Sequence, residues 1–348
     1  MQFYCVTPLS SGVYSRTSFP AVSFMKPPLL TFAVPTYNRP REIERLLGRA
    51  VPQLAEFPGE VDVLIKDDST NDDSEKAARA ILDKYKVPYS YARGKKEGID
   101  PANIYLAQHA KGDFVWWFGD DDELLPGSVA KVLSAIKKHP DAGFIWLNLV
   151  IDGGRTAIPA GEEKLLKNGD EFLENVGIDM TLLSTGIFRR EAALPALPIA
   201  KKYIGTHFAS QPFIFEAVSS GRETVVIAEP CLVNHPTEMV KGQNLFWDGV
   251  TTMGVGYYDI LLEFRGRFGH RAIRKVLARN FGHIWRGLII GWIRRDTEPP
   301  RRRIGELMRY WSYGEFYVAA PLFLLPKCAV RALLKMYKLV FKKSYLEP

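Results

Sequence analysis

The fold class of this chain is decided by one stretch of sequence, Phe114-Val115-Trp116-Trp117-Phe118-Gly119-Asp120-Asp121-Asp122. Five large apolar residues in succession predict a strand that is buried on both faces. The strand runs directly into a glycine and three carboxylates. In an open α/β sheet, ligands bind beyond the carboxyl ends of the strands, so we expect the acidic triplet to mark a binding site.

On both sides of this stretch, short apolar runs alternate with helical patterns, as they do in βαβ proteins. We expect strands at 29–34, 61–65, 89–91, 114–118 and 143–150, separated by helices at 40–55, about 73–85, 101–110 and 126–138. After residue 151 the alternation loosens, and we expect a helix at 168–176 capped by Asn168, a strand at 182–189, a helix at 207–220, and short strands at 224–227 and 231–233. This order predicts an α/β fold with a Rossmann-like, mixed and mostly parallel sheet.

The composition excludes several classes of protein. With 348 residues and 47% hydrophobic content, the chain can bury a large core. Its three cysteines lie far apart without metal-type spacing, which excludes a disulfide scaffold or a zinc ribbon and fits a reducing compartment. The glycine-rich phosphate loops of dinucleotide-binding and Walker-type proteins are absent.

Three polar clusters follow three of the expected strands. They are Thr36-Tyr37-Asn38-Arg39, Asp67-Asp68-Ser69 and Asp120-Asp121-Asp122. Any one acidic pair can be a helix cap or a solvated turn, but three clusters in this order favour a shared site. Crowded carboxylates are costly unless a cation balances them, and their hard oxygens suit Mg²⁺ or Mn²⁺.

These elements resemble the family 2 glycosyltransferases and their A-type nucleotide-diphospho-sugar-binding fold. The resemblance spans about residues 29–240, and within the family the chain is most similar to O-antigen sugar transferases of the abequosyltransferase type. The matching segments are Val34-Pro35-Thr36-Tyr37-Asn38-Arg39, Lys66-Asp67-Asp68-Ser69-Thr70-Asn71-Asp72, Gly98-Ile99-Asp100 with Asn103, and Ala110-Lys111-Gly112-Asp113-Phe114 leading to the acidic triplet.

The resemblance implies a role for each matching residue. Asp67 or Asp68 would accept the imino hydrogen of the nucleobase, which favours a pyrimidine donor carrying UDP, dTDP or CDP. Asp122 would coordinate the Mn²⁺ or Mg²⁺ that bridges the diphosphate, with Asp120 and His235, in Val233-Asn234-His235-Pro236, as further ligands; the alternative for His235 is a hydrogen-bonded structural residue. The expected nucleotide-sugar contacts are Pro35, Thr36, Asn38, Arg39, Asp67, Asp68, Arg93, Asn103, Asp120 and Asp121.

The catalytic base is where the chain departs from the family pattern. Inverting members usually carry a Glu-Asp pair on the helix before the glycine that is Gly221 here, and this pair is absent. His207 is our first candidate because the unperturbed pKa of histidine suits a base at neutral pH. Glu216 and Asp179 are weaker candidates, and His207 can equally be a packing residue at the start of a helix. Without a base, the protein would retain configuration or bind the donor without catalysis.

The two ends of the chain differ from its centre. Residues 1–24 contain no acidic residue and one arginine, which leaves a transit peptide open, although we favour natural translation from Met25. We therefore expect a disordered leader or mis-assigned start at 1–28, the catalytic domain at 29–240, and a basic, aromatic, helical extension at 241–348.

The extension suggests an interaction surface. Residues 260–348 hold 19 Lys and Arg but only 6 Asp and Glu, whereas the rest of the chain has a net charge of −6. The apolar run 316–325 is too short to span a bilayer but suits a helix that lies in an anionic membrane interface. Nucleic-acid binding and ordinary helical or oligomer packing are alternatives, and since no nucleic-acid motif occurs we expect no nucleic-acid partner.

Together these features predict a metal-dependent, inverting glycosyltransferase that acts peripherally on the cytoplasmic face of the plasma membrane. It would move a sugar from a pyrimidine nucleoside diphosphate-sugar to a saccharide or polyprenyl-diphosphate-linked acceptor in surface polysaccharide synthesis. One alternative is a catalytically silent protein that binds nucleotide-sugar or organises an assembly. Another is a nucleotidyltransferase, against which the missing glycine-rich phosphate loop argues.

Overall fold

The computed structural model describes residues 27–151, 154–234, 255–295 and 299–341. Its N-terminal half is a series of parallel strands that alternate with helices. The strands are β1 (Leu30–Thr36), β2 (Val61–Asp67), β3 (Tyr89–Arg93) and β4 (Phe114–Trp117), and the helices between them are α1 (Pro40–Leu54), α2 (Asp73–Tyr85) and α3 (Ile99–His109). The predicted elements of this half are therefore present, with ends that differ by a few residues.

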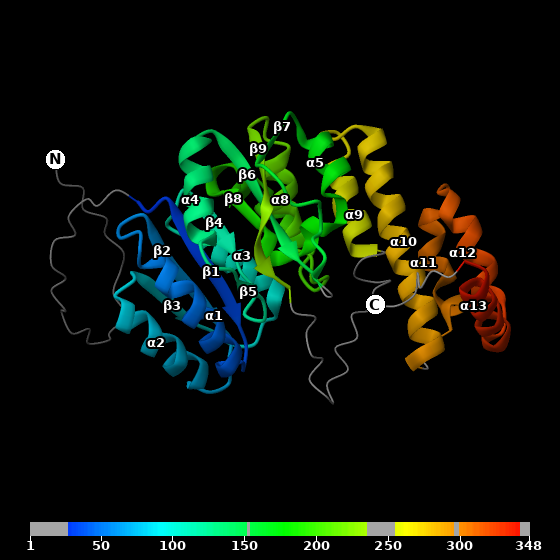
Figure 1. Ribbon diagram of the computed structural model, residues 1–348, viewed down its shortest axis with the longest axis horizontal. Coiled ribbons are helices and arrows are strands. Elements are labelled where there is room, and N and C mark those ends of the chain that lie inside the picture. Colours follow the sequence, from blue (N-terminus) through cyan, green and yellow to red (C-terminus); the bar gives the residue numbers. More distant parts are fainter. Residues whose placement is uncertain (1–26, 152–153, 235–254, 296–298, 342–348) are drawn as a thin grey trace, which may run out of the picture.

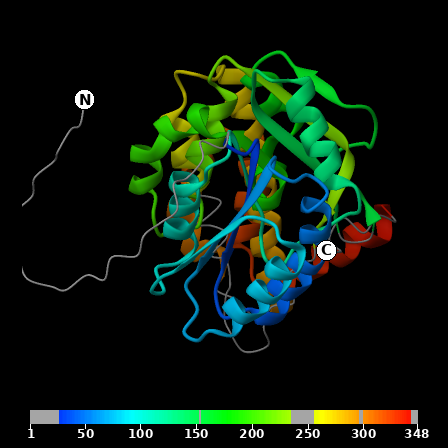
Figure 2. The ribbon, with the colours of Figure 1, turned by 90° about the vertical axis from the view of Figure 1, so that its left-hand side faces the viewer.

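These four strands are parallel and follow the order β3-β2-β1-β4 in the sheet. Helices α1 and α2 contact each other on one face, and α3 packs against β1 and β2 on the other face (Figures 1 and 2). Proline at the first position and apolar residues at helical spacing explain α1, since its buried side chains form one stripe. All four strands consequently end at the same edge.

The second half of the sheet is mixed. Next to β4 lie β8 (Gly186–Arg189) and β6 (Ala142–Val150), both in antiparallel pairs, followed by β9 (Glu223–Val233), which is parallel to β6. Two short strands that the sequence did not reveal, β5 (Glu123–Leu124) and β7 (Lys164–Leu166), pair with β9. The predicted mixed, mostly parallel α/β sheet is confirmed.

Three expectations for this half were wrong in detail. Only 186–189 of the expected strand 182–189 is extended, because Leu183–Thr185 forms a 3₁₀ turn. The expected helix 207–220 begins only at Gln211, as α8 (Gln211–Val218). The two expected short strands are one strand, β9, whose register shift against β6 is bridged by Asn148 Nδ2 donating to the carbonyl of Ala228 at 2.7 Å.

Helices cover the second half and continue beyond it. α4 (Ser128–Lys138) contacts α1 and β9, while α5 (Gly169–Asn175) starts at the predicted cap, where Glu171 N donates to Asn168 Oδ1 at 3.0 Å. α6 (Arg190–Ala193), α7 (Leu197–Lys202) and α8 pack together over β8 and β6. The chain then resumes with α9 (Tyr257–Glu263), α10 (His270–Arg295), α11 (Ile304–Leu307), α12 (Gly314–Leu324) and α13 (Lys327–Phe341).

The C-terminal helices form a helical extension at the end of the molecule opposite β2 and β3 (Figure 1). α9 contacts α8, and the long helix α10 contacts α5 before it reaches α12 and α13. Ion pairs reinforce this attachment, because Arg267 bonds to Glu216 of α8 and Arg279 to Asp179 at 2.8 Å. Within the described residues, no helix is long and apolar enough to cross a membrane.

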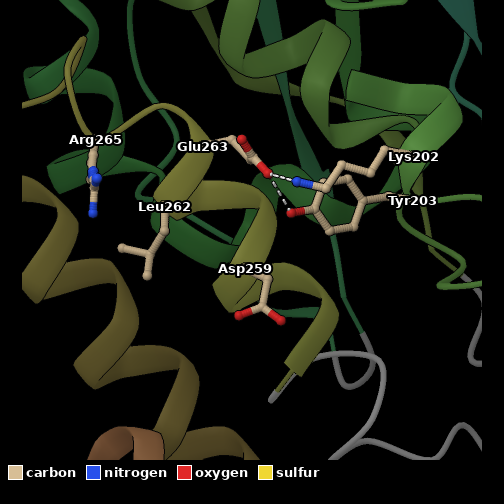
Figure 3. Close-up of a pocket in the computed structure, with 6 residues that line it drawn as sticks. All are labelled: Lys202, Tyr203, Asp259, Leu262, Glu263 and Arg265. Atoms are coloured by element: carbon tan, nitrogen blue, oxygen red, sulfur yellow. Dashed lines mark hydrogen bonds and ion pairs between the residues drawn. The ribbon is translucent and has the colours of Figure 1, made fainter. Parts of the chain in front are cut away.

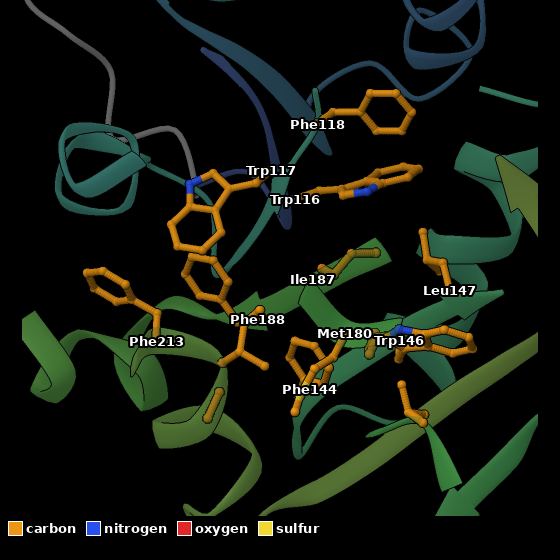
Figure 4. Packing of buried hydrophobic residues seen from close by; sticks show 14 of the residues in the cluster. Trp116, Trp117, Phe118, Phe144, Trp146, Leu147, Met180, Ile187, Phe188 and Phe213 are labelled. Carbon is orange, nitrogen blue, oxygen red and sulfur yellow. The ribbon is translucent and has the colours of Figure 1, made fainter. Parts of the chain in front are cut away.

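The core beneath the sheet edge is built from large aromatic side chains. Trp116, Trp117 and Trp146 are fully buried, and the Trp117 ring meets Phe188 and Phe213 edge-on at centroid distances of 4.5 and 5.6 Å (Figure 4). Aromatic pairs of this geometry contribute about 1 kcal/mol each beyond the area they bury. The end of β4, and with it the acidic triplet, is therefore held by a closely packed base.

Candidate active site at the strand ends

The ends of β1, β2 and β4 are joined by hydrogen bonds between their polar segments. Thr36 Oγ1 donates to Asp120 Oδ2 at 2.8 Å, and the backbone nitrogen of Asp68 donates to the carbonyl of Thr36 at 3.1 Å. Asn38, in the left-handed region at φ 53°, donates its backbone N–H to Ser69 Oγ at 2.7 Å. The structure thus brings together the three clusters that sequence spacing singled out.

Arginine side chains from α1 and the loop before it bind the acidic triplet. Arg39 Nη1 lies 2.8 Å from Asp120 Oδ1 and 3.2 Å from Asp121 Oδ2, and Arg45 Nη2 donates to the carbonyl of Asp121 at 2.7 Å. Burial raises the pKa of Asp120 to about 6, although the Arg39 charge opposes this effect and the Asp121 charge adds to it. The triplet is therefore an anionic centre, buried at Asp120 and Asp122, that cationic groups compensate in part.

Asp122 is held from the opposite side. Ser184 Oγ donates to Asp122 Oδ2 at 2.5 Å and accepts from the backbone N–H of Gly119 at 2.8 Å. Asn234 Nδ2, just beyond the end of β9, donates to Asp122 Oδ1 at 2.8 Å. A Cβ added at Gly119 would lie 3.0 Å from an oxygen of Asp121 and 3.5 Å from Asp122 Oδ2, which explains why glycine precedes the triplet.

The donor set at Asp122 fits a hard divalent cation. Its carboxylate is 6% exposed and accepts hydrogen bonds from the neutral side chains of Ser184 and Asn234. Asp120 is less suited as a ligand, since its oxygens accept from Thr36 and Arg39. No group of three or more His, Cys, Asp or Glu side chains with metal-site geometry occurs in the described ranges. Magnesium sites of nucleotide-dependent enzymes commonly use one or two carboxylates, substrate phosphates and water.

The two carboxylates after β2 differ in their surroundings. Asp67 is completely buried and accepts from the backbone N–H of Ser69 at 2.7 Å and from Tyr91 at 2.8 Å, so it holds the loop in place. Asp68 bonds to Lys66 and has a long contact of 3.4 Å to the N–H of Glu97. Asp68 therefore has an oxygen with weaker engagement and is the better placed of the two to accept a hydrogen bond from a ligand.

Comparison with known proteins decides the family of this part of the chain. Residues 31–194 match the family described as Glycosyl transferase family 2. This segment is a family 2 glycosyltransferase domain. It contains the ends of β1, β2 and β4, and with them all three polar clusters.

Two named glycosyltransferases each match about a third of this chain. An abequosyltransferase of Salmonella typhimurium is 30% identical over 115 residues, which cover 32% of this chain and 34% of that protein. A GalNAc(5)-diNAcBac-PP-undecaprenol beta-1,3-glucosyltransferase of Campylobacter jejuni is 27% identical over 128 residues, covering 36% of this chain and 39% of that protein. The match thus spans a little over a third of the length of these relatives.

Solved structures share the fold over more of the chain. S. aureus TarS 1-349 in complex with UDP superposes with a TM-score of 0.58 and 17% identity, covering 80% of each chain. The mannosyltransferase PcManGT from Pyrobaculum calidifontis, in complex with GDP-Man and Mn²⁺, gives a TM-score of 0.50 at 14% identity and covers 91% of this chain and 82% of that one. At such identities the likeness establishes the fold alone.

Other predicted donor contacts of the glycosyltransferase domain lie around the same edge. Pro35 is buried in β1, and the Asn103 side chain on α3 is 2% exposed with an Oδ1 atom that has no hydrogen-bond partner in the described part of the chain. Arg93 donates to the carbonyls of Ser69 at 3.0 Å and Asn71 at 2.7 Å. Arg93 therefore stabilises the loop after β2, and its contact with base or phosphate stays a prediction.

The candidate bases of the glycosyltransferase domain have different environments. His207 lies before α8 at φ 64°, exposed, and its backbone N–H donates to Asp100 Oδ2 at 2.9 Å. Glu216, in the middle of α8, is 7% exposed and bonds to Arg267 of the C-terminal extension. Asp179 pairs with Arg279. His207 is thus bonded to the first turn of α3, and His235 lies outside the described residues.

Ser184, Asn234 and Arg45 belong to the site but were not predicted. Ser184 lies in a 3₁₀ turn within the expected strand 182–189, and its contact with Asp122 joins residues 62 positions apart. Asn234 directly precedes His235, the expected metal ligand. A surface hollow of about 620 Å³, lined by Lys202, Tyr203, Asp259, Leu262, Glu263 and Arg265, contains none of the predicted residues (Figure 3). Glu263 accepts from both Lys202 and Tyr203 there, so the hollow lies between α7 and α9.

Proposed function

We propose that this chain transfers a glycosyl group from a nucleoside diphosphate-sugar to a saccharide acceptor. The observation that carries the proposal is the junction of Thr36, Arg39 and Asp120 at the strand ends of a family 2 glycosyltransferase domain. The UDP and GDP-Man complexes of TarS and PcManGT, which share this fold, support a nucleotide-sugar donor. A pyrimidine nucleotide, UDP, dTDP or CDP, is the finer proposal, with Asp68 accepting from the base.

The residues at the strand ends divide the work of binding the donor. Thr36 and Asp120 face the ribose, while Arg39 supplies a positive charge beside the diphosphate. A divalent cation at Asp122, Mn²⁺ or Mg²⁺, would neutralise charge on the departing nucleoside diphosphate. Ser184 and Asn234 orient the Asp122 carboxylate, so that it presents its oxygens in a fixed direction.

We assign the catalytic base, which would act on the acceptor, to the loop before α8. His207 is the base we propose for the acceptor hydroxyl, giving inversion, because its backbone is fixed by Asp100 while its side chain is exposed. For the acceptor we propose a polyprenyl-diphosphate-linked saccharide of surface polysaccharide synthesis, in line with the name of the Campylobacter jejuni relative. Peripheral attachment to the inner face of the plasma membrane completes this proposal.

A screen of nucleotide-sugars tests the proposal. With Mn²⁺ and a saturating donor at about 100 times its Kd, binding adds about 2.7 kcal/mol to stability and raises the Tm by roughly 5 °C. Asp122→Asn should lose the metal-dependent part of this rise and the transfer of sugar. Asp72→Asn, which removes an exposed carboxylate paired with Lys76, is the matched control and should keep both.

The outcomes separate the proposal from its alternative. Donor-dependent stabilisation with release of nucleoside diphosphate and a glycosylated product supports the enzyme. Stabilisation without turnover on any acceptor supports a catalytically silent nucleotide-sugar-binding protein instead. If none of UDP, dTDP, CDP, GDP or their sugars shifts the Tm, the assignment of donor-binding roles to these residues is wrong.

A further inference from the structure

The segment 308–336, which includes α12 and most of α13, exposes much apolar surface. Ten large hydrophobic side chains of the described residues are exposed, and seven of them lie between positions 308 and 336. Five of the seven, Trp311, Tyr317, Val318, Leu324 and Met336, are between 57% and 65% exposed. Scattered apolar side chains are normal on protein surfaces, but their concentration in one region marks an interaction site.

Helix α12 is apolar on all sides. Phe316, Ala319 and Phe323 are buried on the side that packs toward α10, whereas Tyr317, Val318 and Leu324 point to solvent. No charged residue occurs between Glu315 and Lys327. A helix without a polar face is expected in a buried position or in contact with lipid, and half of α12 is not buried by the described protein.

Helix α13 adds a basic stripe beside this apolar surface. Lys327, Arg331 and Lys335 follow at intervals of four residues, so they lie along one side of the helix. Leu333 and Met336 are exposed on another side, and Val330 is buried. Residues 316–341 contain no Asp or Glu, and residues 300–341 as a whole carry eight Lys and Arg against two Glu.

The surface lies away from the strand-end site. Figure 1 shows α12 and α13 beyond α10, at the end of the molecule opposite the strands β2 and β3. α10 connects the two regions, because it contacts α5 near its beginning and α12 and α13 further along. A partner bound here would leave the strand ends uncovered.

We propose that the exposed face of α12 and α13 with Trp311, the α12–α13 surface, docks on an anionic lipid bilayer. The apolar side chains enter the acyl boundary, while the Lys and Arg side chains meet the phosphate of the headgroups. The excess of positive charge, with no acidic residue from 316 to 341, fits an anionic lipid surface better than a second copy of the chain, whose own basic stripe would repel it. This proposal rests on the membrane attachment proposed above and names the surface that makes it. Vesicle binding is measured without donor or acceptor, so its result is independent of sugar transfer.

The test is flotation of the full chain with vesicles of phosphatidylglycerol and phosphatidylcholine, compared with phosphatidylcholine alone. The variant V318S/L324S/L333S/M336S should lose about ten-fold or more in affinity for the anionic vesicles. The matched control Y85S/L165S, which replaces exposed apolar side chains on α2 and β7, should float like the unchanged protein. The variant K327Q/R331Q/K335Q should lose about 100-fold, since each charge near an anionic surface contributes about five-fold.

A second measurement, the quenching of tryptophan fluorescence by lipid, leaves the exposed side chains of α12 and α13 unchanged. Brominated lipids should quench part of the tryptophan fluorescence, and Trp311→Phe should abolish that part. Absence of flotation of the unchanged protein, or unchanged flotation of the four-serine variant, would overturn the proposal. The proposal would also be overturned if the unchanged protein is a dimer that does not bind vesicles and the four-serine variant is a monomer. That result would identify this face as a contact between copies of the chain.

Discussion

Replacing Asp100 with alanine should release the loop that precedes α8. The Asp100 carboxylate is 3% exposed and accepts three backbone N–H groups, from Gly205 at 2.8 Å, His207 at 2.9 Å and Ala209 at 3.0 Å. These bonds hold His207 in the left-handed region at φ 64°, a conformation that non-glycine residues rarely adopt. The carboxylate therefore sets the direction in which the His207 side chain leaves the backbone.

The three bonds contribute unequally to stability. Gly205 and His207 are exposed, so water can replace the carboxylate there, and each lost bond costs about 0.5 to 1 kcal/mol. Ala209 is fully buried, and its N–H would be left without an acceptor at a cost of about 1 to 3 kcal/mol. The free energy of unfolding should fall by about 3 kcal/mol in Asp100→Ala.

Urea denaturation measures this loss, and hydrogen exchange followed by mass spectrometry locates it. Exchange should accelerate in residues 204–209 and stay unchanged in the parallel strands. Asp100→Asn keeps the shape and one acceptor oxygen, so it should lose about half as much. Sugar transfer should fall at least ten-fold in Asp100→Ala while donor binding is kept. A loss below about 0.5 kcal/mol with unchanged exchange in the loop would refute the reasoning.

Three further predictions concern the site itself. His207→Ala should keep donor binding and lose transfer, and full activity in a turnover assay would remove it as the base. Ser184→Ala leaves Asp122 and the Gly119 N–H without this partner, so urea unfolding should show a loss of about 1 to 2 kcal/mol and Mn²⁺ titration a weaker affinity. The pH dependence should be measured on protein kept free of metal with a chelator. The pKa of Asp120 is raised to about 6, so between pH 4 and 6 the folded protein keeps a proton that the unfolded chain loses. The free energy of unfolding should therefore fall by up to about 3 kcal/mol as the pH rises through this range. Asp120→Asn should flatten this profile, whereas an unchanged pH dependence would show that another group is responsible.

The sequence predicted what depends on neighbouring residues. An apolar run followed by carboxylates places a charge cluster at a strand end, and parallel strands bring successive clusters to one edge, so the meeting of Thr36 with Asp120 followed from order alone. Pro40 and the apolar spacing of α1 are equally local signals. These features required no knowledge of distant contacts.

What the sequence did not predict depends on residues far apart in the chain. His207 leaves the helical conformation because Asp100, 107 positions earlier, takes its N–H. Ser184 is not extended as expected. Instead, its backbone carbonyl accepts a hydrogen bond from the Trp116 indole N–H at 2.9 Å. Two short strands were expected at 224–227 and 231–233, yet the pairing of β9 with β6 joins them into one strand. Tertiary contacts overrode local preference in each case.

The ion pairs of Arg39 affect how a ligand arrives. Its guanidinium already bridges Asp120 and Asp121, so the chain can fold around these carboxylates before any nucleotide is present. When a diphosphate enters, Arg39 would have to give up part of its contact with Asp120 and Asp121 in order to bind the phosphate oxygens. Such an exchange trades one charge-assisted contact for another, and the net gain in affinity is smaller than the new contacts alone would suggest. If the proposed donor binds here, such a site would favour rapid release of the spent nucleotide over tight retention.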